Sequence, residues 1–131
     1  MIKVIDSHAL MVFLEKESGY EKVQQIFVHA AETDNHLLMT SVNFGEIYYL
    51  VLRECGKEKT KEVEKVIASL PIHIVDVNVE LAKEAGKLKA TKKMSYADCF
   101  AAALAKMNKG ELITGDKEFE EVEKEIKILW L

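Results

Sequence analysis

The chain has 131 residues, of which 49% are hydrophobic and 31% are charged, and its formal net charge is −4. This balance is typical of one globular domain with a sizeable core and excludes a disordered chain, and the negative charge gives no overall attraction to nucleic acid. The sequence shows no signal-peptide pattern and no apolar run of membrane-spanning length, so we expect a cytoplasmic protein.

The first part of the chain predicts a strand, two helices and a second strand. Ile2–Ile5 is a β-branched apolar strand, and Asp6 or Ser7 then caps a helix. Apolar residues keep helical spacing through 20–31, and His36–Met39 is a short strand candidate. This alternation begins the pattern of an α/β protein.

The third predicted helix, Val42–Cys55, carries the clearest apolar face in the chain, and Gly56 ends it. Further apolar residues on its other side predict contact with a second chain, a homodimer. Cys55 and Cys99 are the only cysteines, and we expect both to be buried thiols because each lies in an apolar helical pattern. The inward face comprises Phe44, Ile47, Tyr48, Val51, Leu52 and Cys55, and the outer apolar residues are Val42, Tyr49 and Leu50.

The second half of the chain continues to alternate helices and strands. Such alternation predicts a three-layer α/β/α fold with a central parallel sheet of about four to five strands. We expect residues 1–131 to form a single domain. The predicted elements are a charged helix over 58–70 with Val63, Val66, Ile67 and Leu70 inward, a strand over 72–77, a helix capped by Asn78, a helix over 95–108, a strand over 111–114, a brief helix after Gly115-Asp116 and a strand over 126–131.

Four acidic residues stand where a strand ends or a helix begins. Asp6 and Asp116 directly follow predicted strands, Glu46 lies near the start of the third helix, and Asp98 precedes the wholly small or apolar run Cys99–Ala105. In parallel sheets, sites form at the carboxyl ends of the strands, toward which helix N-termini also point. Carboxylates that converge there repel one another unless cations lie between them. Oxygen ligands alone favour Mg²⁺ or Mn²⁺.

Each of these acids also has a simpler interpretation as a helix cap, because helix starts favour acids. Ser95 with Asp98, and Asn43 with Glu46, have the spacing of a capping box. Caps do not explain why two acids follow apolar strands while a third begins the most apolar helix. A shared cation site explains that placement better.

The remaining charged residues fit solvated faces. Glu17 and the acid-rich stretch Glu118–Glu125 lie in charged surroundings, and His8 is expected to be a neighbour of the site and not a ligand. A basic stretch precedes the Asp98 helix and could contact RNA phosphates or form an ordinary solvated face. Its candidates for RNA contact are Lys89, Lys92 and Lys93.

Four blocks of the chain, in order and at the usual spacing, resemble the motifs of the PIN domain, and most closely the VapC-type toxins of type II toxin–antitoxin systems. The resemblance implies that Asp6, Glu46, Asp98 and Asp116 form an acidic quartet that binds one or two Mg²⁺ or Mn²⁺ ions. Asn43, Thr114 and Ser7 would support that site. The four blocks are Val4–Leu10, Ser41–Ile47, Ser95–Ala105 and Leu112–Phe119.

The same resemblance implies a metal-dependent endoribonuclease that cleaves RNA with an activated water. Its partners would be RNA, a cognate antitoxin that covers the acidic groove, and a second copy of the chain, in an assembly that can grow larger with antitoxin. A PIN nuclease of RNA processing or quality control, or a non-catalytic PIN-like binding module, would share every motif. A haloacid dehalogenase-type phosphatase fits less well, because it needs a second Asp where His8 stands.

Overall fold

A computed structural model describes residues 1–131 and contains five strands, five α-helices and one short 3₁₀ helix. The order of strands and helices agrees with the order expected from the sequence. The elements are β1 Lys3–Ile5, α1 Ser7–Leu14, α2 Tyr20–Thr33, β2 Leu37–Thr40, α3 Ser41–Ser69, β3 Ile72–Val75, α4 Val79–Thr91, α5 Tyr96–Met107, β4 Glu111–Thr114, η1 Lys117–Val122 and β5 Lys127–Trp130.

The five strands form one parallel sheet in the order β3-β2-β1-β4-β5, which confirms the predicted fold class. Strand β1 is central, and its Val4 is in register with Leu38 of β2 and with Leu112 of β4. Because every strand runs in the same direction, the carboxyl ends of β1, β2 and β4 open onto one edge of the sheet. The chain segments that follow those three strands therefore meet there.

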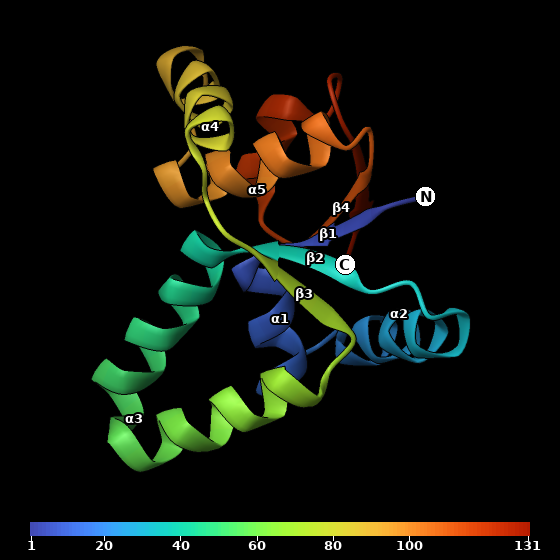
Figure 1. Cartoon of the computed structure of the whole chain (residues 1–131), viewed down its shortest axis with the longest axis vertical. Coiled ribbons are helices and arrows are strands. Elements are labelled where there is room, and N and C mark those ends of the chain that lie inside the picture. The colour runs from blue at the N-terminus through green and yellow to red at the C-terminus, as the bar shows by residue number, and fades with distance from the viewer.

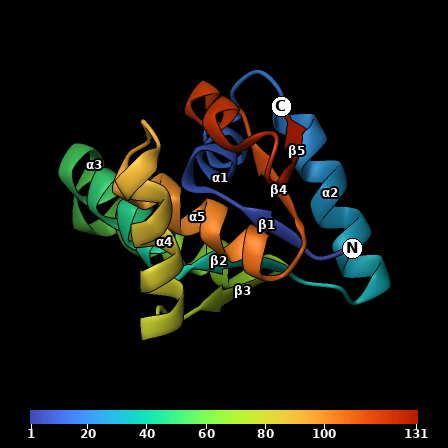
Figure 2. The same ribbon diagram turned by 90° about the horizontal axis from the view of Figure 1, so that it is seen from above.

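Helices cover both faces of the sheet and give the expected three layers (Figures 1 and 2). Helices α4 and α5 lie on one face, with η1, and helices α1, α2 and α3 lie on the other. Side chains alternate along the strands, so Val4 and Leu112 enter the first core while Ile5 and Ile113 enter the second. None of the helices is both long and apolar enough to cross a bilayer.

Helix α5 is buried from Asp98 through Ala105, as its composition predicts. The run of three alanines at 101–103 is completely buried, and α5 packs closely against α4 and against β1, β2 and β4. Small side chains allow the helix backbone to approach its neighbours. This tight packing fixes where the first turn of α5, which contains Asp98, lies relative to the sheet edge.

Helix α3 bends at Gly56, whose φ of 84° lies in the left-handed region, so the two helices expected on either side of Gly56 are both present. The bend turns part of each expected inward face away from the sheet. As a result, the predictions that Cys55 and Val66 are buried are wrong, because both are exposed. Tyr48, two turns before the bend, is also exposed, so its predicted burial is wrong as well. Cys55 and Val66 line an apolar hollow between α1, α2 and the two arms of α3, whereas Cys99 is buried as expected.

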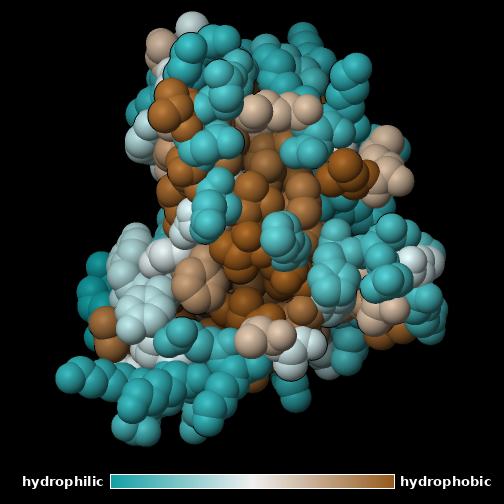
Figure 3. Space-filling model, viewed as in Figure 1, coloured by the Kyte–Doolittle hydropathy of each residue, from teal (hydrophilic) through white to brown (hydrophobic).

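The outer apolar residues of α3 do not form the single surface that was expected. Val42 packs against the core formed with α4 and α5, and Leu50 lines a groove beside α1, so only Tyr49, half exposed, remains on an open face. Figure 3, in the same view as Figure 1, shows hydrophobic residues gathered at the centre of the face on which the edge strand β3 lies. Hydrophilic residues surround them. Half-buried residues of β3 such as Ile72 and Ile74 belong to the core on the α1–α3 side.

Candidate active site

Asp6 directly follows β1 and is fully buried at the edge of the sheet. Its Oδ1 accepts the backbone N–H of Ala9 at 2.8 Å, so Asp6 and not Ser7 is the N-cap of α1. Its Oδ2 accepts a hydrogen bond from the Thr114 hydroxyl at 2.5 Å. One oxygen of this carboxylate is therefore held by the first turn of α1, and the other by the end of the neighbouring strand β4.

Asp116 follows β4 by two residues and lies beside Asp6 in space. The Thr114 hydroxyl oxygen accepts the backbone N–H of Asp116 at 3.0 Å, so Thr114 contacts both acids. Asp116 caps η1, because its Oδ1 accepts the N–H of Glu118 at 2.9 Å. Gly115, between Thr114 and Asp116, lies against the His8 imidazole. A Cβ added at Gly115 would come within 2.9 Å of that ring.

Glu46 enters from α3, one turn beyond the residues that start this helix. Thr40 is the N-cap and accepts the Asn43 N–H at 3.0 Å, while the Thr40 hydroxyl donates to Asn43 Oδ1 at 2.5 Å. The Asn43 amide in turn donates to the Ala97 carbonyl at 3.1 Å, which ties the start of α3 to the start of α5. The Ser7 hydroxyl donates a hydrogen bond to Glu46 Oε1 and so orients this carboxylate toward the start of α1, next to Asp6.

Asp98 lies in the first turn of α5 and is 6% exposed. Ser95 caps the helix by accepting the Asp98 N–H at 3.2 Å. In the expected capping box the Asp98 carboxylate would return to the Ser95 N–H. Instead that N–H donates to Glu118 Oε1 at 2.7 Å, so the Asp98 carboxylate does not cap the helix.

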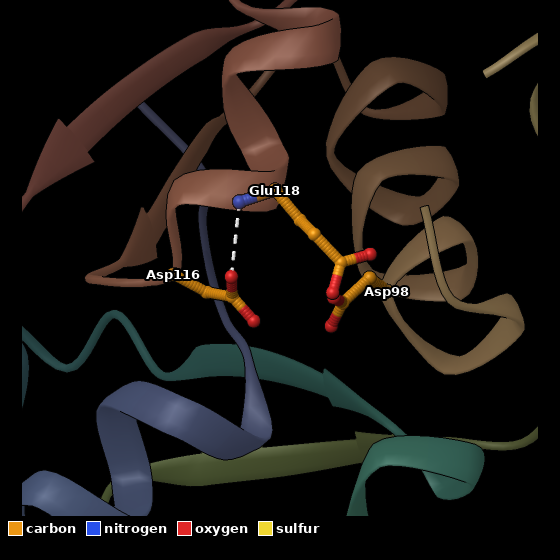
Figure 4. A group of neighbouring side chains, drawn as sticks. All are labelled: Asp98, Asp116 and Glu118. Carbon is orange, nitrogen blue, oxygen red and sulfur yellow. Dashed lines mark hydrogen bonds between the residues drawn. The ribbon is translucent and has the colours of Figure 1, made fainter. Parts of the chain in front are cut away.

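The structure therefore adds one acid that the sequence interpretation placed on a solvated face. Carboxylate oxygens of Asp98, Asp116 and Glu118 all lie within 4.8 Å of one another, and Figure 4 shows the Glu118 carboxylate beside that of Asp98. Glu118 is exposed to solvent, but its carboxylate is aimed into this cluster. Its position two residues after Asp116, at the start of η1, is the only sequence signal for this role.

These acids line a groove of about 550 Å³ between α1, α3, α5 and η1. The fully buried Asp6 lies beneath the groove and interacts electrostatically with both Asp98 and Asp116. The groove is strongly acidic, because six of its eleven lining residues are Asp or Glu and none is Lys or Arg. Its lining comprises Ser7, His8, Met11, Glu17, Glu46, Leu50, Glu54, Ser95, Asp98, Asp116 and Glu118.

Two of these carboxyls hold their protons more tightly than usual. Burial raises the pKa of Asp6 to about 6, although the hydrogen bonds from Thr114 and Ala9 oppose the rise. Burial, and after it the negative charges of Asp116, Asp6 and Glu118, together raise the pKa of Asp98 to about 7. The site is thus unfavourable to its own negative charge in the absence of a cation.

The donor set fits a hard divalent cation. The group of side chains close enough together to hold an ion offers only carboxylate oxygens, and neither cysteine lines the groove. Oxygen-only ligation suits Mg²⁺ or Mn²⁺ and disfavours zinc, which takes nitrogen and sulfur ligands. Asp98 and Asp116 supply oxygens close to each other, the Glu118 carboxylate lies beside them, and Asp6 interacts with both aspartates from beneath.

The basic residues before α5 are engaged within the fold. Lys89 donates to the Met94 carbonyl at 2.8 Å, and Lys92 forms an ion pair with Glu125 at 3.5 Å. The Lys93 backbone N–H donates to Glu121 Oε1 at 3.0 Å, while its side chain is exposed. Two of the three lysines proposed for RNA contact thus have structural partners, which favours the structural alternative for them.

A family model described as PIN domain matches residues 3–125. A VapC ribonuclease of Mycobacterium bovis and ribonuclease VapC30 of Mycobacterium tuberculosis are each 26% identical to the chain over 124 residues, which cover 89% of this chain and 92% of the relative.

Solved structures share the fold over nearly the whole chain. The VapBC2 structure from Rickettsia felis, bound to a DNA fragment from its promoter, has a TM-score of 0.78 at 17% identity and covers 100% of this chain and 99% of that one. The DNA-bound VapBC structure from Salmonella typhimurium has a TM-score of 0.77 at 18% identity, with 98% and 97% covered. Since the family model spans most of the residues and the fold agrees, the chain belongs to the PIN-domain family.

Proposed function

We propose that this chain is a divalent-metal-dependent endoribonuclease, formed by one PIN domain over residues 1–131, and that it is the toxin of a type II toxin–antitoxin pair. The observation that supports the proposal most strongly is the convergence of Asp98 and Asp116 on one groove above the buried Asp6. The sequence relatives named ribonucleases point to the same activity.

Asp6, Asp98 and Asp116 would hold one or two Mg²⁺ or Mn²⁺ ions, with Glu46 either a further ligand or the group that orients the attacking water. When bound, such an ion lowers the pKa of a water molecule and offsets negative charge at the scissile phosphate. The chain's own contribution is to fix the carboxylates in advance. Thr114 holds Asp6 by a hydrogen bond at 2.5 Å, and Ser7 holds Glu46.

The open, acidic groove also bears on substrate binding. A polyanion does not approach a cluster of carboxylates unless cations neutralise it, so metal binding and RNA binding should depend on each other. The same acidity suits a basic segment of a cognate antitoxin, which would compete with RNA for the groove. One solved structure that shares the fold is a toxin–antitoxin complex from Klebsiella pneumoniae.

An assay with purified protein and single-stranded or structured RNA tests the activity. We expect cleavage with Mn²⁺ or Mg²⁺, none with a chelator, and products with 5′-phosphate and 3′-hydroxyl ends. Absence of metal-dependent cleavage on every RNA tried would favour a non-catalytic PIN-like module. A small antitoxin that co-purifies with the chain and inhibits cleavage would separate a toxin from a nuclease of RNA processing.

Homodimerisation belongs to the same proposal. The half-exposed Tyr49 and the neighbouring Tyr48, which is 40% exposed, leave aromatic surface open on α3. Light scattering at micromolar concentration measures the oligomeric state directly. A monomer at that concentration would contradict this part of the proposal, and a dimer that Tyr49→Lys dissociates would support it.

A further inference from the structure

We propose that Glu118 is a positioning residue: its carboxylate caps α5 from outside the helix, and this frees the Asp98 carboxylate to face Asp116. The proposal rests on the nuclease function proposed above, because it assigns Glu118 to the same site. It concerns how the two aspartates are held at their separation. It does not make Glu118 a ligand.

The first argument comes from the start of α5. Asp98 occupies the third helical position after the N-cap Ser95, which is the position whose carboxylate returns to the cap N–H in a capping box. Here the Ser95 N–H donates to Glu118 Oε1 at 2.7 Å, while Ser95 Oγ still accepts the Asp98 N–H at 3.2 Å. The Glu118 carboxylate thus makes the hydrogen bond that the Asp98 carboxylate would make in a capping box. The Asp98 carboxylate is therefore available to the groove.

The second argument is that Glu118 is also fixed to Asp116. Its backbone N–H donates to Asp116 Oδ1 at 2.9 Å, and its side chain reaches the Ser95 N–H. Glu118 thus links the segment that follows β4 to the first turn of α5. The spacing of Asp98 and Asp116 is set across this link (Figure 4).

The surrounding contacts make the link rigid. Phe119 is completely buried and anchors η1 in the core. Farther along η1, Glu121 Oε1 accepts the Lys93 N–H at 3.0 Å, and beyond η1 Glu125 pairs with Lys92 at 3.5 Å. The segment that leads into α5 is therefore held at three points by side chains from 118–125.

Electrostatics support a capping role. A third carboxylate beside Asp98 and Asp116 adds like-charge repulsion, which needs a compensating interaction. The N–H groups at the start of a helix carry partial positive charge and stabilise an anion there. The hydrogen bond from the Ser95 N–H supplies that compensation.

Two substitutions separate positioning from ligation. Glu118→Gln keeps an acceptor oxygen for the Ser95 N–H but removes the charge, whereas Glu118→Ala removes both. Glu120→Ala is the matched control, because Glu120 lies in the same 3₁₀ helix and is exposed. The readouts are hydrogen exchange of the Ser95 amide without metal, Mn²⁺ affinity by calorimetry, and RNA cleavage.

We expect Glu118→Gln to keep the Ser95 amide protected and to bind Mn²⁺ nearly as tightly as the wild type. Glu118→Ala should lose that protection, bind Mn²⁺ about tenfold more weakly and cleave RNA more slowly by about 10- to 100-fold. The Glu120→Ala control should match the wild type in all three readouts.

Two results would overturn the positioning role in a wild-type protein that binds Mn²⁺ and cleaves RNA. One is a Glu118→Gln variant that keeps Ser95 protected but loses as much Mn²⁺ affinity as Glu118→Ala, because the charge would then act directly. The other is a Glu118→Ala variant that is unchanged. The proposed function fails separately, if the wild type neither binds Mn²⁺ nor cleaves RNA, and the positioning role falls with it.

Discussion

The Thr114 hydroxyl donates to Asp6 Oδ2 at 2.5 Å and accepts the backbone N–H of Asp116 at 3.0 Å. This hydroxyl joins the carboxyl ends of the adjacent strands β1 and β4 through two of the proposed metal-binding acids. A short, fully buried side chain of this kind fixes carboxylates before any ligand arrives.

Thr114→Val should weaken both the fold and the site, because valine has nearly the same shape but can neither donate to Asp6 nor accept from Asp116. We expect a loss of about 1–3 kcal/mol in the free energy of unfolding and a fall in RNA cleavage of about 10- to 100-fold. Urea denaturation measures the first effect and initial cleavage rates the second.

Thr91→Val is the matched control, since the Thr91 hydroxyl lies on an exposed part of α4 and bonds only the Lys87 carbonyl. That variant should resemble the wild type. A Thr114→Val protein with wild-type stability and cleavage rate would show that the bond to Asp6 is unimportant.

The metal-free protein should become less stable as the pH rises from about 4 to about 7. The folded-state pKa values of Asp6 and Asp98, about 6 and about 7, lie above the ordinary value of an aspartate, so the folded state binds more protons than the unfolded state across this range. The stability that this protonation contributes is complete below the ordinary pKa and is lost as pH rises through the folded pKa.

Thermal melts across this pH range, in chelator, measure the effect. Asp98→Asn cannot ionise at this position and should flatten the decline. Saturating Mn²⁺ should raise the melting temperature most at neutral pH, because the carboxylates that bind it are most ionised there. Binding to the folded state alone adds about 2.7 kcal/mol when the free ion exceeds its dissociation constant a hundredfold. A pH-independent melting temperature in chelator would contradict the assigned pKa shifts.

Asn43 should matter to activity although it lies outside the groove. Its amide donates to the Ala97 carbonyl, directly before Asp98, at 3.1 Å, and is fully buried. Asn43→Ala removes this bridge and leaves the Thr40 hydroxyl without its acceptor. We expect a loss of about 1–3 kcal/mol in unfolding free energy and at least about tenfold slower cleavage.

Asn108→Ala serves as the comparison, because the Asn108 amide donates to the Leu104 carbonyl at 2.8 Å at the C-terminal end of α5, the end far from Ala97. That variant should lose some stability but retain the wild-type cleavage rate. Equal effects of the two substitutions on cleavage would show that Asn43 acts only through the stability of α5.

Much of the fold could be predicted from the sequence because its strongest signals are local. The β-branched strand before Asp6 and the apolar run after Asp98 identify a buried strand and a buried helix. The alternation of strands and helices then predicts a parallel sheet, in which the carboxyl end of that strand and the N-terminus of that helix lie at one edge. The features that escaped prediction depend on contacts between distant segments. Cys55 is exposed beside the bend at Gly56, and the spacing of apolar residues along a helix does not predict the direction of such a bend.

Glu118 illustrates the same limit within the site. It stands at the head of an acid-rich stretch, and only its position two residues after Asp116 distinguishes it from Glu120 or Glu123. Its hydrogen bond to Ser95 spans 23 residues, so only the packing of η1 against α5 reveals it. The partners of Lys89 and Lys92 are likewise invisible until α5 and η1 are placed.

The central claim is that the carboxylates around Asp98 hold the metal ion needed for RNA cleavage, and cleavage by Asp98→Asn tests it most directly. Asparagine keeps the size of the side chain and the Ser95 cap, so the variant should fold with an unchanged circular dichroism spectrum. With Mn²⁺ it should cleave RNA at least about a hundredfold more slowly than the wild type. Cleavage by Asp98→Asn at the wild-type rate would contradict the site proposed here.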